Sequence, residues 1–427
     1  MGGAAAWHVA VHYPDRWFAA NPGAGFSETP RFLKVFQRET LAPTWYERKL
    51  WNLYDCDRWA SNLAQCPTVA YSGALDTQKQ AADVMEEALA GQGIKLVHVI
   101  GPGTRHAYHP DARTEVDRRL ASLARIGREH VPREVHFTTY TLRYDRSHWV
   151  TVDRLGEHWS EARIDAALAP GNVIDVRVRN VEAFTLDFAP GTAPFEPGKP
   201  VSVVIDGAAT PQAPTFSDRS WTASYHHDEG TWKPGKPSSE GPSKRHGLQG
   251  PIDDAFMDSF VFVRPTGTSR HPRVQAWVDA ELARAVEHWR RQFRGDARVV
   301  DDVAVTEEMV QSSNLAVWGD PESNTWIKRW NGPIGWDGAS IKVGGKTFDA
   351  SGHVLAAIHP NPANPSRYLV LNSGFTFREY DYLNNARQVP KLPDWAVIDL
   401  GQAPDARSPG KVVDAGFFGE RWELRQP

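Results

Sequence analysis

The first 130 residues alternate between segments with helical and with strand-like spacing of apolar positions. Ala81, Val84, Met85, Ala88 and Leu89 recur three to four residues apart, which is typical of an amphipathic helix. The pattern predicts helices over residues 2–12, 77–90 and 111–126, strands over 18–21, 67–72 and 95–100, and a helical insertion over 30–60. Because strands and helices alternate with short links, these residues are expected to form a parallel α/β sheet.

Residues 131–205 change to short, β-rich runs separated by Pro-Gly pairs. Pro170-Gly171, Pro190-Gly191 and Pro197-Gly198 are turn signals between such runs. This segment is therefore predicted to be a small antiparallel module resembling a β-sandwich. Residues 206–258 are rich in Pro, Gly, Ser and charge, and we interpret them as a linking segment.

The pattern returns to α/β alternation over residues 259–427. A long amphipathic helix is predicted over residues 273–293. Strands are predicted over residues 259–264, 297–305, 314–319, 368–373 and 395–400. The expected fold class is thus α/β: an N-terminal sheet with helices, a β module over 131–205, a linker and a C-terminal α/β domain.

The amino-acid composition of the chain argues against several classes of protein. The chain has 427 residues, which is too long for one ordinary domain, and 41% hydrophobic residues, which excludes a disordered chain. It carries 48 basic and 52 acidic residues, so its formal charge of −4 disfavours a nucleic-acid partner. No apolar run reaches the roughly 18 residues of a membrane span. The start lacks a signal-peptide pattern, and we expect a secreted or periplasmic location only for a longer, intact protein.

Metal and cofactor chemistry find little support in the sequence. With only Cys56 and Cys66, a zinc site built on paired Cys motifs is excluded, and either one disulfide or two free thiols remain open. His226 and His227 are adjacent, so their side chains diverge and do not suit a single metal ion. We therefore expect neither metal nor cofactor.

The candidate chemistry is an ordered set of residues at predicted strand ends. Asp76 follows one strand, and His106 follows the next in a Gly-rich loop. Hydrolytic triads of α/β proteins place the acid and the His in this order after sheet strands, with the nucleophile earlier on a sharp strand-to-helix turn. Asp76 also suits a helix N-cap, a role compatible with catalysis. His109, just before Pro110, is expected to make a structural hydrogen bond.

The residues Met1-Gly2-Gly3-Ala4-Ala5-Ala6 resemble the end of a Gly-x-Ser-Met-Gly-Gly nucleophile elbow. That elbow is found in the α/β-hydrolase superfamily, notably in prolyl-oligopeptidase-like peptidases and related esterases. The resemblance covers residues 1–130 and implies the last three strands of the hydrolase sheet. It implies that His106 is the general base, that Asp76 orients it, and that the backbone of Met1 contributes to the oxyanion hole. The Ser would precede Met1, so the chain is expected to be an inactive fragment.

The resemblance implies that the intact protein is a serine hydrolase cleaving an ester or peptide bond through an acyl-enzyme. Its substrate would be a peptide or a small ester, with no cofactor; the sequence leaves the oligomeric state open. Two alternatives remain. One is a non-catalytic binding protein in which the hydrolase-like part is a scaffold and the Trp-rich C-terminal region binds a glycan or a protein. The other is a carbohydrate esterase with the same triad.

Overall fold

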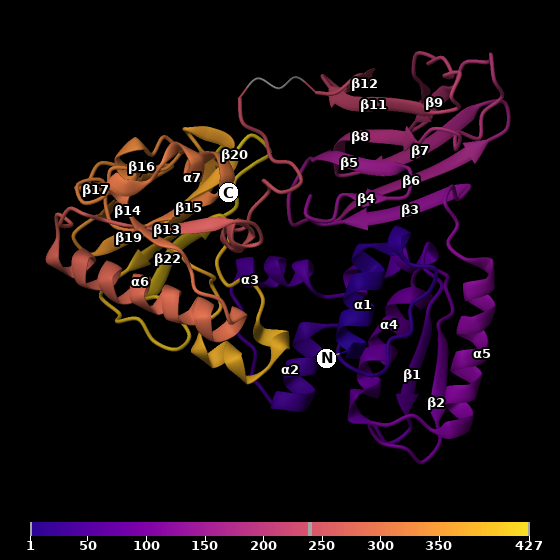
Figure 1. Ribbon diagram of the computed structural model, residues 1–427, viewed down its shortest axis with the longest axis horizontal. Coiled ribbons are helices and arrows are strands. Elements are labelled where there is room, and N and C mark those ends of the chain that lie inside the picture. The colour runs from indigo at the N-terminus through magenta and orange to yellow at the C-terminus, as the bar shows by residue number, and fades with distance from the viewer. Residues whose placement is uncertain (1, 238–240, 426–427) are drawn as a thin grey trace. The chain divides into compact units, whose positions relative to one another are not determined.

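The computed structural model describes residues 2–237 and 241–425, and these form a mixed α/β chain with several sheets. The chain divides into two compact units. Unit 1 comprises Met1–Ala42 and Trp51–Ser238, and unit 2 comprises Pro43–Leu50 and Ser239–Pro427. Unit 1 holds an α/β part followed by a β-sandwich, and unit 2 holds a larger α/β sheet (Figure 1).

The α/β part of unit 1 is parallel, as its alternating pattern predicts. Strands β1 (Val69–Gly73) and β2 (Val97–Gly101) pair in parallel. Ala20 and Gly23 form parallel bridges to Thr68 and Tyr71, so a third extended segment lies along the other edge of β1. This segment overlaps the strand predicted over residues 18–21 and continues two residues further, to Gly23. The helices here are α1 (Gly2–His12), α2 (Thr29–Gln37), α4 (Gln80–Ala90) and α5 (Pro110–Ile126), with 3-10 turns η1 (Pro14–Arg16), η2 (Trp51–Leu53), η3 (Asp57–Ala64) and η4 (Thr77–Lys79).

Helices cover both faces of this small sheet (Figure 1). On one face Ala70 packs with Trp7 of α1 and Met85 of α4. On the other face Tyr71 packs with Val116 of α5. Alternate residues of a strand point to opposite faces, so a strand buried on both sides reads as one apolar run.

The β-sandwich consists of two five-stranded sheets with one shared core, in which Phe137 and Ile164 of one sheet meet Phe184 and Trp221 of the other. One sheet has the order β10-β9-β7-β6-β3 and the other β12-β11-β8-β5-β4. Their strands are β3 (Glu134–Thr139), β4 (Arg146–Ser147), β5 (Val150–Leu155), β6 (Ala162–Ala169), β7 (Val173–Arg179), β8 (Val181–Phe188), β9 (Ser202–Ile205), β10 (Ala208–Ala209), β11 (Trp221–Asp228) and β12 (Thr231–Pro234).

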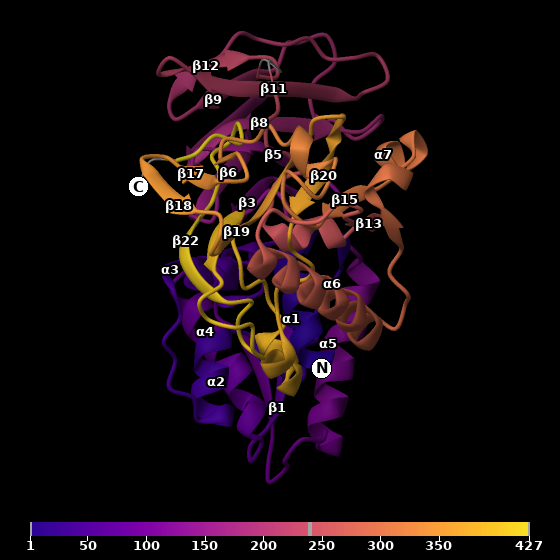
Figure 2. The ribbon, with the colours of Figure 1, turned by 90° about the vertical axis from the view of Figure 1, so that its left-hand side faces the viewer.

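The sandwich extends further than the sequence predicted. Residues 206–258 were expected to be a linker, but β11 and β12 belong to the second sheet, and β11 pairs with β8 (Figure 2). Trp221 and Tyr225 on β11 are buried in the core, whereas Thr222 on the other face is exposed. A strand with one polar face inside a Pro- and Gly-rich stretch resembles a linker by composition alone.

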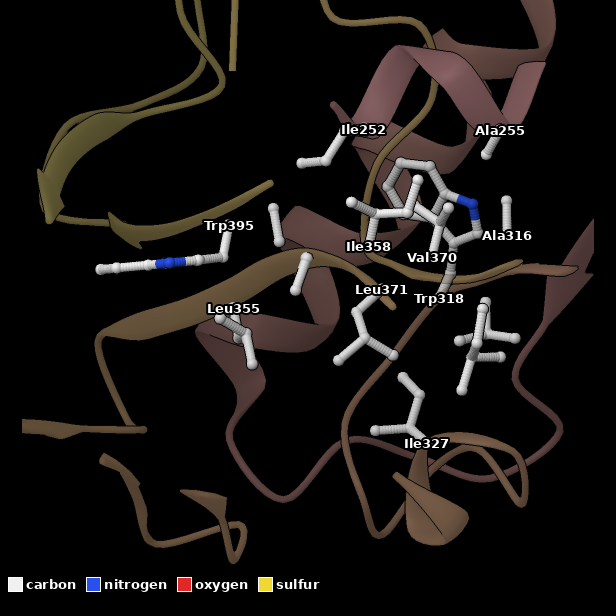
Figure 3. Close-up of a cluster of buried hydrophobic side chains, with 14 of the residues drawn as sticks. Ile252, Ala255, Ala316, Trp318, Ile327, Leu355, Ile358, Val370, Leu371 and Trp395 are labelled. Carbon is white, nitrogen blue, oxygen red and sulfur yellow. The ribbon is translucent and has the colours of Figure 1, made fainter. Parts of the chain in front are cut away.

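Unit 2 is built on a seven-stranded sheet with the order β14-β13-β15-β20-β19-β21-β22, of which the first four strands are parallel and the rest antiparallel. Ile358 of β19 and Val370 and Leu371 of β20 lie in its core with Trp318 and Ile252 (Figure 3). The elements are α3 (Trp45–Leu50), η5 (Ile252–Phe256), β13 (Phe260–Arg264), α6 (Pro272–Phe293), β14 (Val299–Asp301), η6 (Asp302–Ala304), α7 (Glu307–Ser312), β15 (Asn314–Val317), η7 (Ile327–Arg329), β16 (Gly335–Trp336), β17 (Ser340–Val343), β18 (Lys346–Asp349), β19 (His353–Asn361), β20 (Asn364–Leu371), η8 (Glu379–Leu383), η9 (Asn385–Arg387), β21 (Trp395–Asp399) and β22 (Lys411–Gly416).

Cys56 and Cys66 are both free and buried, so the structure contains two thiols rather than a disulfide between them. Burial raises the pKa of Cys66 to about 12. Among the helices of residues 2–237 and 241–425, none has the length and apolar character needed to cross a membrane.

Candidate active site

The two loops that carry Asp76 and His106 lie side by side at one edge of the small sheet. Because β1 and β2 are parallel, the loops after Gly73 and Gly101 leave the same edge. The backbone N–H of Ala74 donates to the carbonyl of Gly101 at 2.9 Å, and that of Leu75 to Thr104 at 2.8 Å. The structure thus brings together the two residues that the sequence singled out.

Gly73 permits this close approach. A Cβ atom at this position would lie 2.1 Å from the carbonyl oxygen of Arg105 and 2.5 Å from that of Thr104. Both neighbours are backbone atoms, so no side-chain rotation could relieve the overlap. The absence of a side chain at residue 73 is therefore a condition for the contact between the two loops.

Asp76 and His106 form a direct hydrogen bond. Nδ1 of His106 lies 2.8 Å from Oδ2 of Asp76, and the Asp side chain is only 6% exposed while the His side chain is 67% exposed. The other oxygen, Oδ1, accepts the backbone N–H of Gln78 at 2.9 Å and caps the turn that begins α4. One carboxylate therefore performs both roles weighed from the sequence, capping and orienting the imidazole.

This contact orients the imidazole ring and favours one tautomer of its neutral form. With Nδ1–H donating to Asp76, the tautomer leaves Nε2 with a lone pair. The large exposure of His106 makes this nitrogen accessible from outside the loop. A His oriented in this way can accept a proton from a hydroxyl group placed against Nε2.

Tyr71 and Tyr108 brace the His106 loop. The hydroxyl of Tyr71 donates to the carbonyl of Ala107 and accepts the backbone N–H of His109, both at 2.8 Å. Tyr108 stacks on Tyr71 with ring centroids 4.0 Å apart and donates to Asn21 Oδ1 at 3.0 Å. His109 occupies the N-cap position of α5, but its side chain makes no cap hydrogen bond and its Nδ1 is buried without a partner. The structural hydrogen bond expected of His109 is made by its backbone N–H alone. Tyr71 was not among the predicted site residues, because the only signal it gives in the sequence is a polar hydroxyl group within an apolar strand.

The first turn of α1 meets the same region. A Cβ atom at Gly3 would lie 2.1 Å from the carbonyl oxygen of Gly23. A Cβ at Gly25, whose φ is +87°, would lie 2.4 Å from the backbone nitrogen of Ala4. The N–H of Gly25 donates to Gln78 Oε1 at 3.1 Å, which links this loop to the turn after Asp76. Met1, the predicted oxyanion residue, lies outside the described residues.

Potential metal ligands occur elsewhere in unit 1. In the part of the chain that the structure describes, Asp83, Glu86 and His98 bring one ligand-type atom each to within 4.8 Å of one another. Lys79 forms an ion pair with Asp83, and Ser72 Oγ lies 3.0 Å from Nε2 of His98. These protein partners already occupy the group, so we assign it no metal. His226 and His227 face different partners, Gly235 and Glu182.

Comparison with known proteins gives a match to an uncharacterized relative. No family model and no solved structure matches the chain. The chain is 26% identical over 461 aligned residues to an uncharacterized secreted protein of Arthroderma benhamiae, and the alignment covers 99% of this chain and 46% of that protein. The chain thus spans about half the length of the curated relative it matches. Assignment of a function therefore depends on the fold and on the contact between Asp76 and His106.

Proposed function

We propose that this chain carries the acid and the histidine of a serine-hydrolase site of the α/β-hydrolase type. The protein to which they belong would cleave ester or peptide bonds. The observation that carries the proposal is the 2.8 Å contact between His106 Nδ1 and Asp76 Oδ2 at adjacent ends of two parallel strands. In such hydrolases the acid precedes the His along the chain, as it does here.

The arrangement around the pair supports the same assignment. The extended segment near residues 20–24, β1 and β2 are three consecutive parallel elements, each followed by helical structure. The Asp follows the second and the His follows the third. The first turn of α1 lies against Gly23 and Gly25, beside the loop that bears Asp76. This is the position expected of a helix that follows a nucleophile elbow.

In the proposed mechanism, Nε2 of His106 accepts the hydroxyl proton of a Ser as its Oγ forms a bond to the substrate carbonyl carbon. Asp76 stabilises the imidazolium that results and holds its tautomer. His106 then donates the proton to the leaving alcohol or amine. Water, activated by the same nitrogen, releases the acyl group. The proposal places this Ser immediately before Met1 and the oxyanion hole at the Met1 backbone. The substrate is a peptide or a small ester.

Export of the protein belongs to this proposal. The matched relative is described as secreted and is about twice as long as this chain. A longer protein of this kind would have room for the elbow and for a signal segment.

The test begins with the coding sequence upstream of the Met1 codon and continues with the protein that it encodes. We expect a Gly-x-Ser before Met1 and covalent labelling by a fluorophosphonate probe. His106→Ala and Asp76→Asn should each lower ester hydrolysis by about 10³-fold or more, because the Ser loses its base or the base its tautomer. The exposed His130→Ala is the matched control and should keep wild-type activity.

Two results would reject the proposal. One is an upstream sequence without a Ser at the elbow, which would favour a binding protein on a hydrolase-derived scaffold. The other is labelling that persists at the wild-type rate in His106→Ala.

A further inference from the structure

A lysine and an aspartate are buried against each other in unit 2. Nζ of Lys244 lies 2.6 Å from Oδ2 of Asp394, and both side chains have 0% exposure. Lys244 precedes η5, and Asp394 lies directly before β21. The two residues are 150 positions apart, so only the tertiary structure brings them together.

The contact is poorly satisfied as an ion pair. An ammonium group has three N–H donors, whereas the structure gives Lys244 one acceptor and the ring of Trp422 at 4.8 Å. Oδ2 of Asp394 also accepts the N–H of Phe418 at 2.9 Å, but Oδ1 is buried without a partner. Two charges removed from water need a full set of hydrogen bonds to offset their desolvation, and this pair lacks it.

The surroundings hold the carboxyl group in one position. A Cβ atom at Gly250 would lie 2.2 Å from Oδ1 and 3.0 Å from Cγ of Asp394, so only glycine fits there. The N–H of Gly250 is in turn fixed by Tyr368, whose hydroxyl lies 3.0 Å away and donates to Asp254. An amine and a carboxyl group that are buried and held in contact have a large effective concentration for each other.

We propose that Lys244 and Asp394 join through an intramolecular amide bond between Nζ and Cγ. The ammonium group first gives a proton to the carboxylate, and the lone pair of the neutral amine then attacks Cγ. The Nζ–Cγ bond forms, the Cγ–Oδ1 bond breaks, and Oδ1 leaves as water with two of the three ammonium protons. The step releases one water molecule and needs no oxidant, reductant or cofactor.

The product resolves the defects of the ion pair. The amide keeps one oxygen, Oδ2, which still accepts the N–H of Phe418. The oxygen that leaves is the one without a partner. Nζ keeps a single N–H, close to the face of Trp422. Burial also raises the pKa of Asp394, which favours the protonated carboxyl group, the better electrophile.

The bond would link a segment near the start of unit 2 to its last strands. A link between residues 150 positions apart restricts the unfolded chain and therefore stabilises the folded one. It would resist reducing agents, unlike a disulfide, and it does not depend on the proposed hydrolase function.

The mass of the full chain, measured after denaturation, tests the proposal. We expect a mass lower than the calculated one by one water molecule. After proteolysis, a branched peptide should contain both Lys244 and Asp394. The calculated mass without loss of water would overturn the proposal, and that measurement does not require any variant to fold.

Two variants and one chemical control complete the experiment. Lys244→Arg should restore the calculated mass of the variant chain. Lys346→Arg, which changes an exposed lysine paired with Asp414, should still show the loss of water. Asp206 and Asp337 each precede a Gly and can lose water as a succinimide, which hydroxylamine cleaves. Cleavage of the dehydrated chain by hydroxylamine, or a loss of water that maps to these two positions, would overturn the proposal.

Discussion

At the scale of the residue, one missing side chain sets the distance between the two loops of the candidate site. Gly73 lies against the backbone of Arg105 and Thr104, and Asp76 follows three residues later. The hydrogen bond between Asp76 and His106 therefore depends on a position that takes no part in any chemistry. A larger residue is poorly tolerated at such a position, because its side chain would overlap with backbone atoms, which cannot rotate away.

Gly73→Ala should consequently lower the free energy of unfolding by about 1–3 kcal/mol, because the loops must separate to admit the methyl group. Gly91→Ala is the matched control: it lies in the same unit, has a φ of −62°, and its Cβ would meet only an ordinary contact at 3.4 Å. Its effect should stay below about 1 kcal/mol. Urea denaturation of both variants checks the prediction, and equal effects would contradict it.

Buried histidines should make unit 2 sensitive to acid. Burial lowers the pKa of His359 to about 4 and that of His288 to about 3. Both rings stay neutral in the folded chain while the unfolded chain binds protons below about pH 6.5. The contribution of these two rings to the free energy of unfolding is therefore complete above pH 6.5. It decreases as the pH falls below 6.5 and is lost as the pH passes through the folded pKa values.

For His359 alone this loss amounts to about 3 kcal/mol at pH 4. His359→Phe keeps an aromatic ring beside Trp422 and should show a flatter dependence of stability on pH between 6.5 and 4. Denaturant titrations at pH 7 and pH 4.5 measure the difference. If the variant kept the same dependence of stability on pH, the folded chain would accept the proton on His359 at no cost in stability, and the prediction would be wrong.

At the scale of the element, β11 shows how composition can hide a strand. Trp221 and Tyr225 on β11 are buried between the two sheets, while Thr222 faces outward. The segment contains many polar residues because only one of its faces is covered. β19 was missed for a related reason: it contains Pro360, which disfavours a strand, and the pairing shifts register at that residue.

Trp221→Ala should lower the free energy of unfolding of unit 1 by about 3–5 kcal/mol, since it leaves a cavity against Phe188 and Phe195. Thr222→Ala, on the outer face of the same strand, should change it by less than about 1 kcal/mol. Thermal unfolding followed by tryptophan fluorescence and circular dichroism compares the two. If both substitutions changed the free energy of unfolding by the same small amount, residues 206–258 would be a linker, as the sequence suggested.

At the scale of the whole molecule, burial rather than a disulfide stabilises the described chain. Cys56 and Cys66 are free thiols in the core of unit 1. A thiol reagent such as Ellman's reagent should react with both only after denaturation, and dithiothreitol should leave the thermal midpoint unchanged. Rapid reaction of either thiol in the native protein would contradict this prediction.

The N-terminal α/β part was largely predictable, because each helix and strand there has its own local pattern of apolar residues. The pairing of Asp76 with His106 was also predictable, since consecutive parallel strands bring their ends to one edge and the two residues are only 30 positions apart. The role of Tyr71 was not predictable, because its hydroxyl group bonds the backbone of Ala107 and His109, and the spacing of residues in the sequence does not show where that loop lies.

Local patterns in the amino-acid sequence predict the helices and strands of the N-terminal α/β part and the order of the candidate acid and His, because periodicity and chain order are local properties. Which polar groups meet inside the molecule depends on the folded arrangement. Gly73 admits the carbonyl of Arg105, and Lys244 meets Asp394 across 150 positions. Such contacts depend on packing between distant segments and on the loss of water around them, and no local pattern encodes either.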